Sequence, residues 1–117
     1  MTALRTAAAA LVLCLAGAAQ ATDYAPLDCA RARTPTERVI CHNYALGQQE
    51  ARMATLFEWT MSLVAMGQRG DIGDAQRDFI KTREACGIRI ACIRAAYDKR
   101  IAELDAVMKN IASRGPF

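Results

Sequence analysis

Several features that would indicate a catalytic or nucleic-acid-binding protein are missing from this sequence. Its 117 residues include one histidine and no C-x-x-C or C-x-x-C-H motif, so neither a redox-active dithiol nor covalent haem is expected. Its 15 basic and 12 acidic residues alternate along the chain, which does not favour a nucleic-acid partner. Alternating β-branched runs and repeats are also absent, so few strands are expected. No nucleophile with its base, phosphate-binding loop or metal cluster can be assembled, and we expect neither an enzyme nor a bound cofactor.

The first 21 residues have the layout of a secretory signal peptide. Arg5 precedes an uncharged run of alanine, leucine and valine, which ends in the small-residue site Ala19-Gln20-Ala21. This run is shorter than the roughly 20 apolar residues that a membrane-spanning helix needs, so we expect cleavage after Ala21. Cys14 follows Leu13, where a lipoprotein signal has a small residue, and we expect it to be an apolar residue of the signal peptide. The sequence thus predicts a periplasmic or secreted domain over residues 22–117.

Four cysteines remain after this cleavage: Cys29, Cys41, Cys86 and Cys92. An even number in a small exported chain indicates disulfides, and the three possible pairings are not distinguished by sequence alone. We expect the two local pairs, Cys29–Cys41 and Cys86–Cys92. Residues six apart in one helix are separated by about 9 Å along its axis, which is too far for a disulfide. Either the helix therefore breaks after Cys86, where Gly87 could end it, or each cysteine has another partner.

The apolar pattern predicts a small all-α bundle of three to four helices, stapled by disulfides. The expected helices cover about residues 34–44, 45–66, 74–86 and 90–112. Thr34, Pro35 and Glu37 form a capping box with a proline at the first helical position, which marks the start of the first helix. Three glycines between residues 67 and 73 predict a break, so we expect the third helix to begin at Asp71 or Asp74.

Three segments of the chain also resemble a known family. They are DCARARTPTERVIC, ALGQQEARMATLFEW and AQRDFIKTREACGIRIACIRAAYDKRIAEL. They are similar to the lysozyme inhibitor LprI-like N-terminal domain family of small exported bacterial domains. The family's opening motif maps onto Asp28, Cys29, Ala32, Thr34, Glu37, Ile40 and Cys41. Its closing motif maps onto Gln76, Arg77, Ile80, Arg83, Cys86, Cys92, Ile93, Tyr97, Arg100, Ile101 and Leu104.

The chain departs from the family pattern at three places. Phe79 stands where the family usually has tryptophan, Phe57 stands where tyrosine is common, and Gln49-Glu50 replaces a Leu-Asp pair. The first two changes keep an aromatic ring. The resemblance implies a helical, disulfide-stapled exported domain and, for the family's namesake lipoprotein, inhibition of lysozyme.

Three arginines of the closing motif, Arg77, Arg83 and Arg100, have two interpretations. They could offer a basic surface to the catalytic carboxylates of a lysozyme, with which arginine forms paired charge-assisted hydrogen bonds. They could instead tie helix ends together or pair within the chain. The candidate partners for such pairing are Asp78, Glu84 and Glu103.

Other side chains also have both a functional and a structural interpretation. Trp59 either widens the buried stripe of its helix or is an exposed anchor for a partner. Glu37 and Asp28 could act as an acid–base pair, but the capping box and a loop position account for them. His42 is expected to be an exposed helical residue rather than a metal ligand. The methionines that could bind copper(I), but whose spacing favours packing, are Met53, Met61, Met66 and Met108.

The sequence therefore predicts an exported, non-catalytic binding protein. The resemblance implies a lysozyme inhibitor that occludes the cleft of a muramidase. The alternative is a structural or stress-related module that binds another envelope protein through a helix face, with a soft-metal carrier as a third possibility. Neither a metal site nor stable membrane insertion after cleavage is expected.

Overall fold

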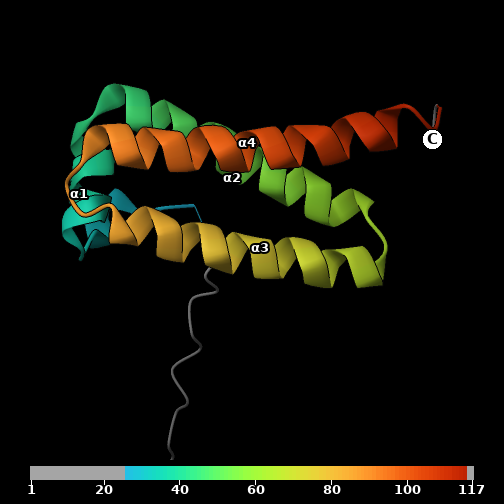
Figure 1. The fold of residues 1–117 in the computed structure, drawn as a ribbon, viewed down its shortest axis with the longest axis horizontal. Helices are drawn as coiled ribbons and strands as arrows, with labels where there is room; N and C mark the ends of the chain where they lie inside the picture. The colour runs from blue at the N-terminus through green and yellow to red at the C-terminus, as the bar shows by residue number, and fades with distance from the viewer. Residues whose placement is uncertain (1–25, 116–117) are drawn as a thin grey trace, which may run out of the picture.

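The chain folds into three long helices and one short helix, preceded by a single turn of 3₁₀ helix (Figure 1). The computed structural model describes residues 26–115, and the predicted signal peptide, its cleavage site and Cys14 lie outside this range. The elements are η1 (Cys29–Arg31), α1 (Pro35–His42), α2 (Tyr44–Leu63), α3 (Met66–Ala85) and α4 (Ile90–Ala112). Residues 26–115 contain no strand. The prediction of a small, disulfide-stapled all-α bundle is confirmed.

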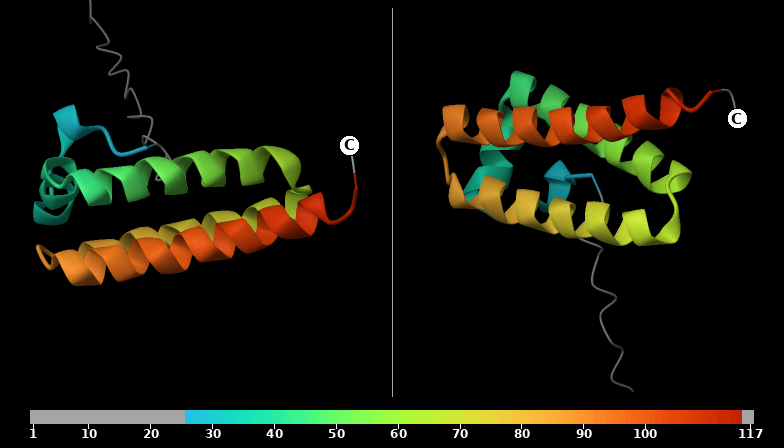
Figure 2. Two further views of the ribbon diagram at one scale, coloured as in Figure 1. Left: turned by 90° about the horizontal axis from the view of Figure 1, so that it is seen from above. Right: turned by 45° about the vertical axis from the view of Figure 1, so that its right-hand side comes forward.

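The three long helices lie lengthwise beside one another. α2 and α4 run in the same direction and pack closely together, and α3 returns in the opposite direction along α4 (Figures 1 and 2). α1 lies across the end of the bundle where α2 begins and α3 ends. The C-terminal end of α4 lies at the other end of the bundle, which is also the end of the turn between α2 and α3. The bundle therefore has two distinct ends, one closed by α1 and one formed by the α2–α3 turn.

The core lies between these helices. The most deeply buried large side chains are Tyr97, Ile40, Leu46, Ile93 and Leu104. Phe79 of α3 meets Tyr97 of α4 edge to face, with 5.3 Å between ring centroids, an arrangement that contributes about 1 kcal/mol beyond area burial. The buried residues of α4 thus form the face on which α2 and α3 pack.

Local signals in the sequence account for the start of α1. The Thr34 side chain accepts a hydrogen bond from the Glu37 backbone N–H at 3.0 Å, and the Glu37 carboxylate accepts one from the Thr34 N–H at 3.1 Å. The predicted capping box is therefore confirmed, with Pro35 as the first helical residue. Asn43 separates α1 from α2 and caps α2 through the Leu46 N–H.

The predicted break at the glycine-rich stretch is wrong. α3 begins at Met66, well before Asp71 and Asp74, and the turn between α2 and α3 is confined to Val64 and Ala65. Helical glycine costs about 1 kcal/mol relative to alanine, but Val64, just before the stretch, and Ile72, within it, are both buried. Packing of these two side chains requires a close turn followed at once by helix, so tertiary contacts outweigh the local preference of the glycines.

Both disulfides join the cysteine pairs that were expected. Cys29 pairs with Cys41 and fastens η1 to α1, while Cys86 pairs with Cys92 across the junction of α3 and α4. The Cα atoms of each pair are 5.6 Å apart. Gly87, with φ +60°, ends α3 in the left-handed conformation that a glycine adopts without strain. Of the two alternatives left open by the six-residue spacing, the helix break after Cys86 is the one observed.

Candidate functional site

A cluster of buried polar side chains joins the three long helices near the α1 end. Arg83 of α3 donates from Nη1 to Glu50 Oε2 of α2 at 3.3 Å and lies 3.4 Å from the Tyr97 hydroxyl of α4. The Tyr97 hydroxyl donates to the same Glu50 oxygen at 2.5 Å. Glu50 Oε1 accepts the backbone N–H of Leu27 at 2.9 Å, so the segment before η1 is fastened to the same carboxylate. Glu84 completes the cluster by accepting from Arg83 Nη2 at 3.0 Å.

Burial and neighbouring charges shift the ionisation of this cluster. Burial lowers the pKa of Arg83, but its interactions with Tyr97, Glu50 and Glu84 outweigh this and raise the pKa above its ordinary value. Burial and the negative charge of Glu50 raise the pKa of Tyr97 far above that of an exposed tyrosine. Tyr97 is therefore a neutral hydrogen-bond donor and Arg83 a cation. The cluster therefore holds complementary charges in place between the three long helices.

Arg100 forms a second buried connection, between α4 and α3. Its Nε donates to Gln76 Oε1 at 2.8 Å and its Nη2 to the Ile72 carbonyl at 3.0 Å. Its Nη1 donates to Glu103 at 3.1 Å. Burial lowers the pKa of Arg100, and the interaction with Glu103 partly opposes this shift. Arg100 therefore ties the middle of α3 to α4.

The prediction that Arg83 and Arg100 belong to an exposed partner-binding surface is wrong. Their side chains are 7% and 4% exposed, and each guanidinium group bonds to other groups of the same chain rather than facing solvent. The alternative interpretation, pairing with Glu84 and Glu103, is the one that the structure supports. Arg77 differs from the other two, since it is exposed on α3 and forms an ion pair with Asp74 rather than with the expected Asp78.

The buried bonding roles of two members of these clusters, Glu50 and Gln76, were not predicted from the sequence. Glu50 follows Leu46 by four residues and precedes Met53 by three, so it lies in the apolar stripe of α2. Gln76 precedes Phe79 by three residues in the same way, and its amide lies 3.2 Å from the Met53 sulfur. A polar residue at an apolar position of a helix was the available signal, because such a group must find a partner when buried.

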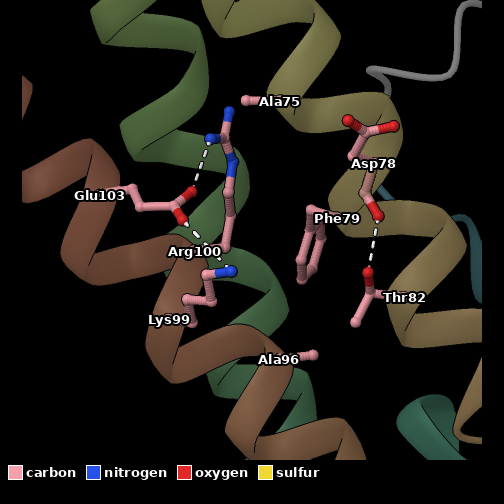
Figure 3. Close-up of a pocket in the computed structure, with 8 residues that line it drawn as sticks. All are labelled: Ala75, Asp78, Phe79, Thr82, Ala96, Lys99, Arg100 and Glu103. Atoms are coloured by element: carbon pink, nitrogen blue, oxygen red, sulfur yellow. Dashed lines mark hydrogen bonds and ion pairs between the residues drawn. The ribbon is translucent and has the colours of Figure 1, made fainter.

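A groove of about 230 Å³ lies between α3 and α4 (Figure 3). Its lining residues are Ala75, Asp78, Phe79, Thr82, Ala96, Lys99, Arg100 and Glu103. The polar groups of this lining bind one another or their own helix: the Thr82 hydroxyl donates to the Asp78 carbonyl at 2.9 Å, and Glu103 accepts from Arg100. The lining therefore presents no nucleophile with an adjacent base.

The junction of α3 and α4 forms a rigid, projecting corner, which we call the corner loop (Cys86–Cys92). Ile88 is 68% exposed and Ile90 is 42% exposed on it. Arg89 folds back and donates from Nε to the Cys86 carbonyl at 3.1 Å, which neutralises the end of α3. The buried Thr36 hydroxyl of α1 donates to the Gly87 carbonyl at 2.9 Å. A disulfide and two hydrogen bonds thus hold two exposed isoleucines in fixed positions.

A second group of exposed apolar residues lies at the other end of the bundle. Trp59 is 60% exposed, Leu63 is 48% exposed and Met66 is 78% exposed. We call these three residues the turn patch, because they flank the turn between α2 and α3. Of the two interpretations of Trp59, exposure favours the partner anchor over a buried stripe residue.

The remaining candidates have structural positions. Glu37 is held in the capping box, where partial burial raises its pKa but the N–H groups of Arg33 and Thr34 outweigh this and lower it below the ordinary value. Asp28 caps η1 by accepting from the Ala30 N–H. His42 is exposed at the end of α1.

Between residues 26 and 115, no group of three or more histidine, cysteine, aspartate or glutamate residues could hold a metal ion. Over the same range no helix is both long and apolar enough to cross a membrane.

The chain matches no protein-family model, no curated protein and no solved structure.

Proposed function

We propose that this chain is an exported, non-catalytic binding protein of the lysozyme-inhibitor type, and that it occludes a muramidase cleft with its corner loop. The observation that carries the proposal is the pair of exposed isoleucines, Ile88 and Ile90, on a corner closed by a disulfide. The resemblance to the LprI-like family supplies the target class. Export, by a signal peptide cleaved after Ala21, is part of the same proposal.

The rigidity of the corner loop favours tight binding. Ordering one residue of a flexible loop costs about 1 to 2 kcal/mol on binding, and a loop already fixed by a disulfide avoids most of this cost. Burying Ile88 in an apolar subsite contributes about 1 to 2 kcal/mol. A convex apolar element of this kind complements a concave binding site.

The charge around the corner loop matches the chemistry of a muramidase cleft. Glycoside hydrolases of this type carry two carboxylic residues on either side of the bond that they cleave. Arg94 is exposed on the first turns of α4, one turn after Ile90, and its side chain makes no ion pair or hydrogen bond within residues 26–115. It is therefore better placed to reach acidic groups of a partner than the buried Arg83 and Arg100.

The test is a titration of the oxidised protein into c-type and g-type lysozymes while lysis of a cell-wall suspension is followed. Saturable inhibition near one-to-one is expected. The variant Ile88→Asp should raise the inhibition constant at least tenfold, because it brings a carboxylate against an acidic cleft and removes about 1.4 kcal/mol or more of binding. Leu63→Asp, a matched change at the opposite end of the bundle, is the control and should inhibit as the parent does.

The outcomes separate the candidate functions. Absence of inhibition at tens of micromolar, with helicity intact by circular dichroism, would refute the proposal that the chain inhibits lysozyme. Loss of inhibition in the control but not in Ile88→Asp would show that the contact is not made by the corner loop. The second candidate, a module that binds another part of the cell envelope, is favoured by the turn patch, which the corner-loop contact leaves uncovered.

A further inference from the structure

A charge-free stretch of ten residues surrounds the turn between α2 and α3. It runs from Trp59 to Gln68, between Glu58 and Arg69. The fold divides this stretch: Thr60 and Val64 are buried in the bundle, whereas the three residues of the turn patch point outward. Single exposed apolar side chains are ordinary on protein surfaces, but here a tryptophan, a leucine and a methionine are all exposed around one turn.

Basic side chains lie at the same end of the bundle as the turn patch. Arg69 lies on the first turn of α3, with its Nη1 3.9 Å from the Met66 sulfur. The last turn of α4 carries Lys109, followed by Arg114, and this end of α4 lies at the same end of the bundle as the α2–α3 turn (Figures 1 and 2). These three cations are all exposed, and the acidic residues next to the stretch are Glu58 and Asp71.

We propose that the turn patch docks on the surface of an anionic lipid bilayer. Tryptophan has an apolar ring with one polar N–H and is favoured at the level of the lipid headgroups. Leu63 and Met66 would enter the boundary of the acyl chains, while the cations at this end of the bundle meet anionic headgroups. This contact is peripheral, so it requires no membrane-spanning segment. It does not rest on the proposed muramidase contact, which is at the other end of the bundle.

A second copy of the chain fits the turn patch less well than a lipid surface does. Three side chains bury roughly 400 Å² at most, about half of the roughly 800 Å² per partner that a standard stable interface covers. A bilayer has no such minimum area, because its affinity grows with each inserted apolar side chain and each neighbouring cation. The cations at this end of the bundle also favour an anionic surface over a second copy, which would bring the same cations together.

The experiment uses the fluorescence of Trp59, which is the one tryptophan of the sequence and lies within the patch. The oxidised protein is mixed with vesicles of equal parts phosphatidylglycerol and phosphatidylcholine, and in parallel with vesicles of phosphatidylcholine alone. We expect a blue shift, quenching by brominated acyl chains, and binding that weakens as salt is raised. The variant Leu63→Ser/Met66→Ser should bind the mixed vesicles at least tenfold more weakly. The control Ile88→Ser/Ile90→Ser changes two exposed apolar residues at the other end and should bind as the parent does.

Several outcomes would overturn the proposal. One is an unchanged Trp59 spectrum with both kinds of vesicle. Equal loss of binding in the patch variant and the control would show that the contact is not at the α2–α3 turn. If the blue shift appears without vesicles, depends on protein concentration and is accompanied by a dimer in sedimentation, the patch is the interface with a second copy of the chain. The assay contains no lysozyme, so its result is separate from that of the inhibition test.

Discussion

Glu50 provides the sharpest test of how this fold is held together, through the substitution Glu50→Gln. The carboxylate has two oxygens and accepts from three donors: the Leu27 N–H, the Tyr97 hydroxyl and Arg83 Nη1. A glutamine amide has one oxygen and adds two donors of its own, so at least one of these buried groups loses its acceptor. Arg83 also loses the negative charge that compensates its burial.

The expected loss in the free energy of unfolding is about 3 kcal/mol. Removing one partner of a buried ion pair costs about 3 to 5 kcal/mol, and the remaining contact of Arg83 with Glu84 places this case at the lower end. In a domain of this size each kcal/mol lowers the melting temperature by about 4 to 8 °C, so a decrease of about 12 to 24 °C is expected. Glu58→Gln, at an exposed position of the same helix, is the control and should change the stability by less than about 0.5 kcal/mol.

A double-mutant cycle with Arg83→Met identifies the source of this loss. Arg83→Met alone leaves Glu50 buried without its cation and should also cost about 3 kcal/mol, whereas the double variant removes both charges and should cost clearly less than the sum. Urea unfolding of the oxidised proteins gives all four free energies. The reasoning fails if Glu50→Gln costs less than about 1 kcal/mol, or if the two losses add within about 0.5 kcal/mol.

Three further predictions concern other parts of the fold. Arg100→Met should lower the free energy of unfolding by about 2 to 3 kcal/mol, measured by urea unfolding, because Gln76 Oε1 loses its donor in the core; an unchanged midpoint would contradict this. Gly87→Ala should destabilise by about 1 to 2 kcal/mol because φ is +60°, whereas Gly70→Ala, with open space around its Cβ position in a helix, should stabilise by about 0.5 to 1 kcal/mol in the same thermal melts. The pKa of Glu37 is lower in the folded than in the unfolded chain, so its stabilisation is present above pH of about 4.3 and is lost as the pH falls through the folded pKa. Acid unfolding of Glu37→Gln should therefore have a weaker pH dependence below about pH 4.3 than the parent, and an identical pH profile would refute the assignment.

The parts of the fold that could be predicted from sequence are those with local causes. The capping box of Thr34 and Glu37 satisfies N–H groups within a few residues, and Gly87 supplies a left-handed residue where one is needed. The two disulfides also join cysteines that are close along the chain, as expected, although the sequence alone did not distinguish the three possible pairings. In each case the interaction depends on few residues and little on the rest of the molecule.

The parts that were missed depend on contacts between distant segments. The start of α3 at Met66 is set by burial of Val64 and Ile72, which the pattern of glycines does not reveal. The functional interpretation of Arg83 could be decided only once Glu50, 33 residues earlier, was seen to lie against it. A periodic pattern shows which face of a helix is buried, but it does not show which polar residues on neighbouring faces meet.

The two buried arginine connections also restrict how the helices can be aligned. Apolar stripes alone allow one helix to slide past another by a turn, about 5.4 Å, and to remain covered. Arg83, which pairs with Glu50, lies two turns along α3 from Gln76, which pairs with Arg100. The two connections therefore lie at different heights on α3. A slip of one turn would separate both pairs at once and leave charged groups against apolar ones. The polar clusters therefore select a single register among several that hydrophobic burial would tolerate.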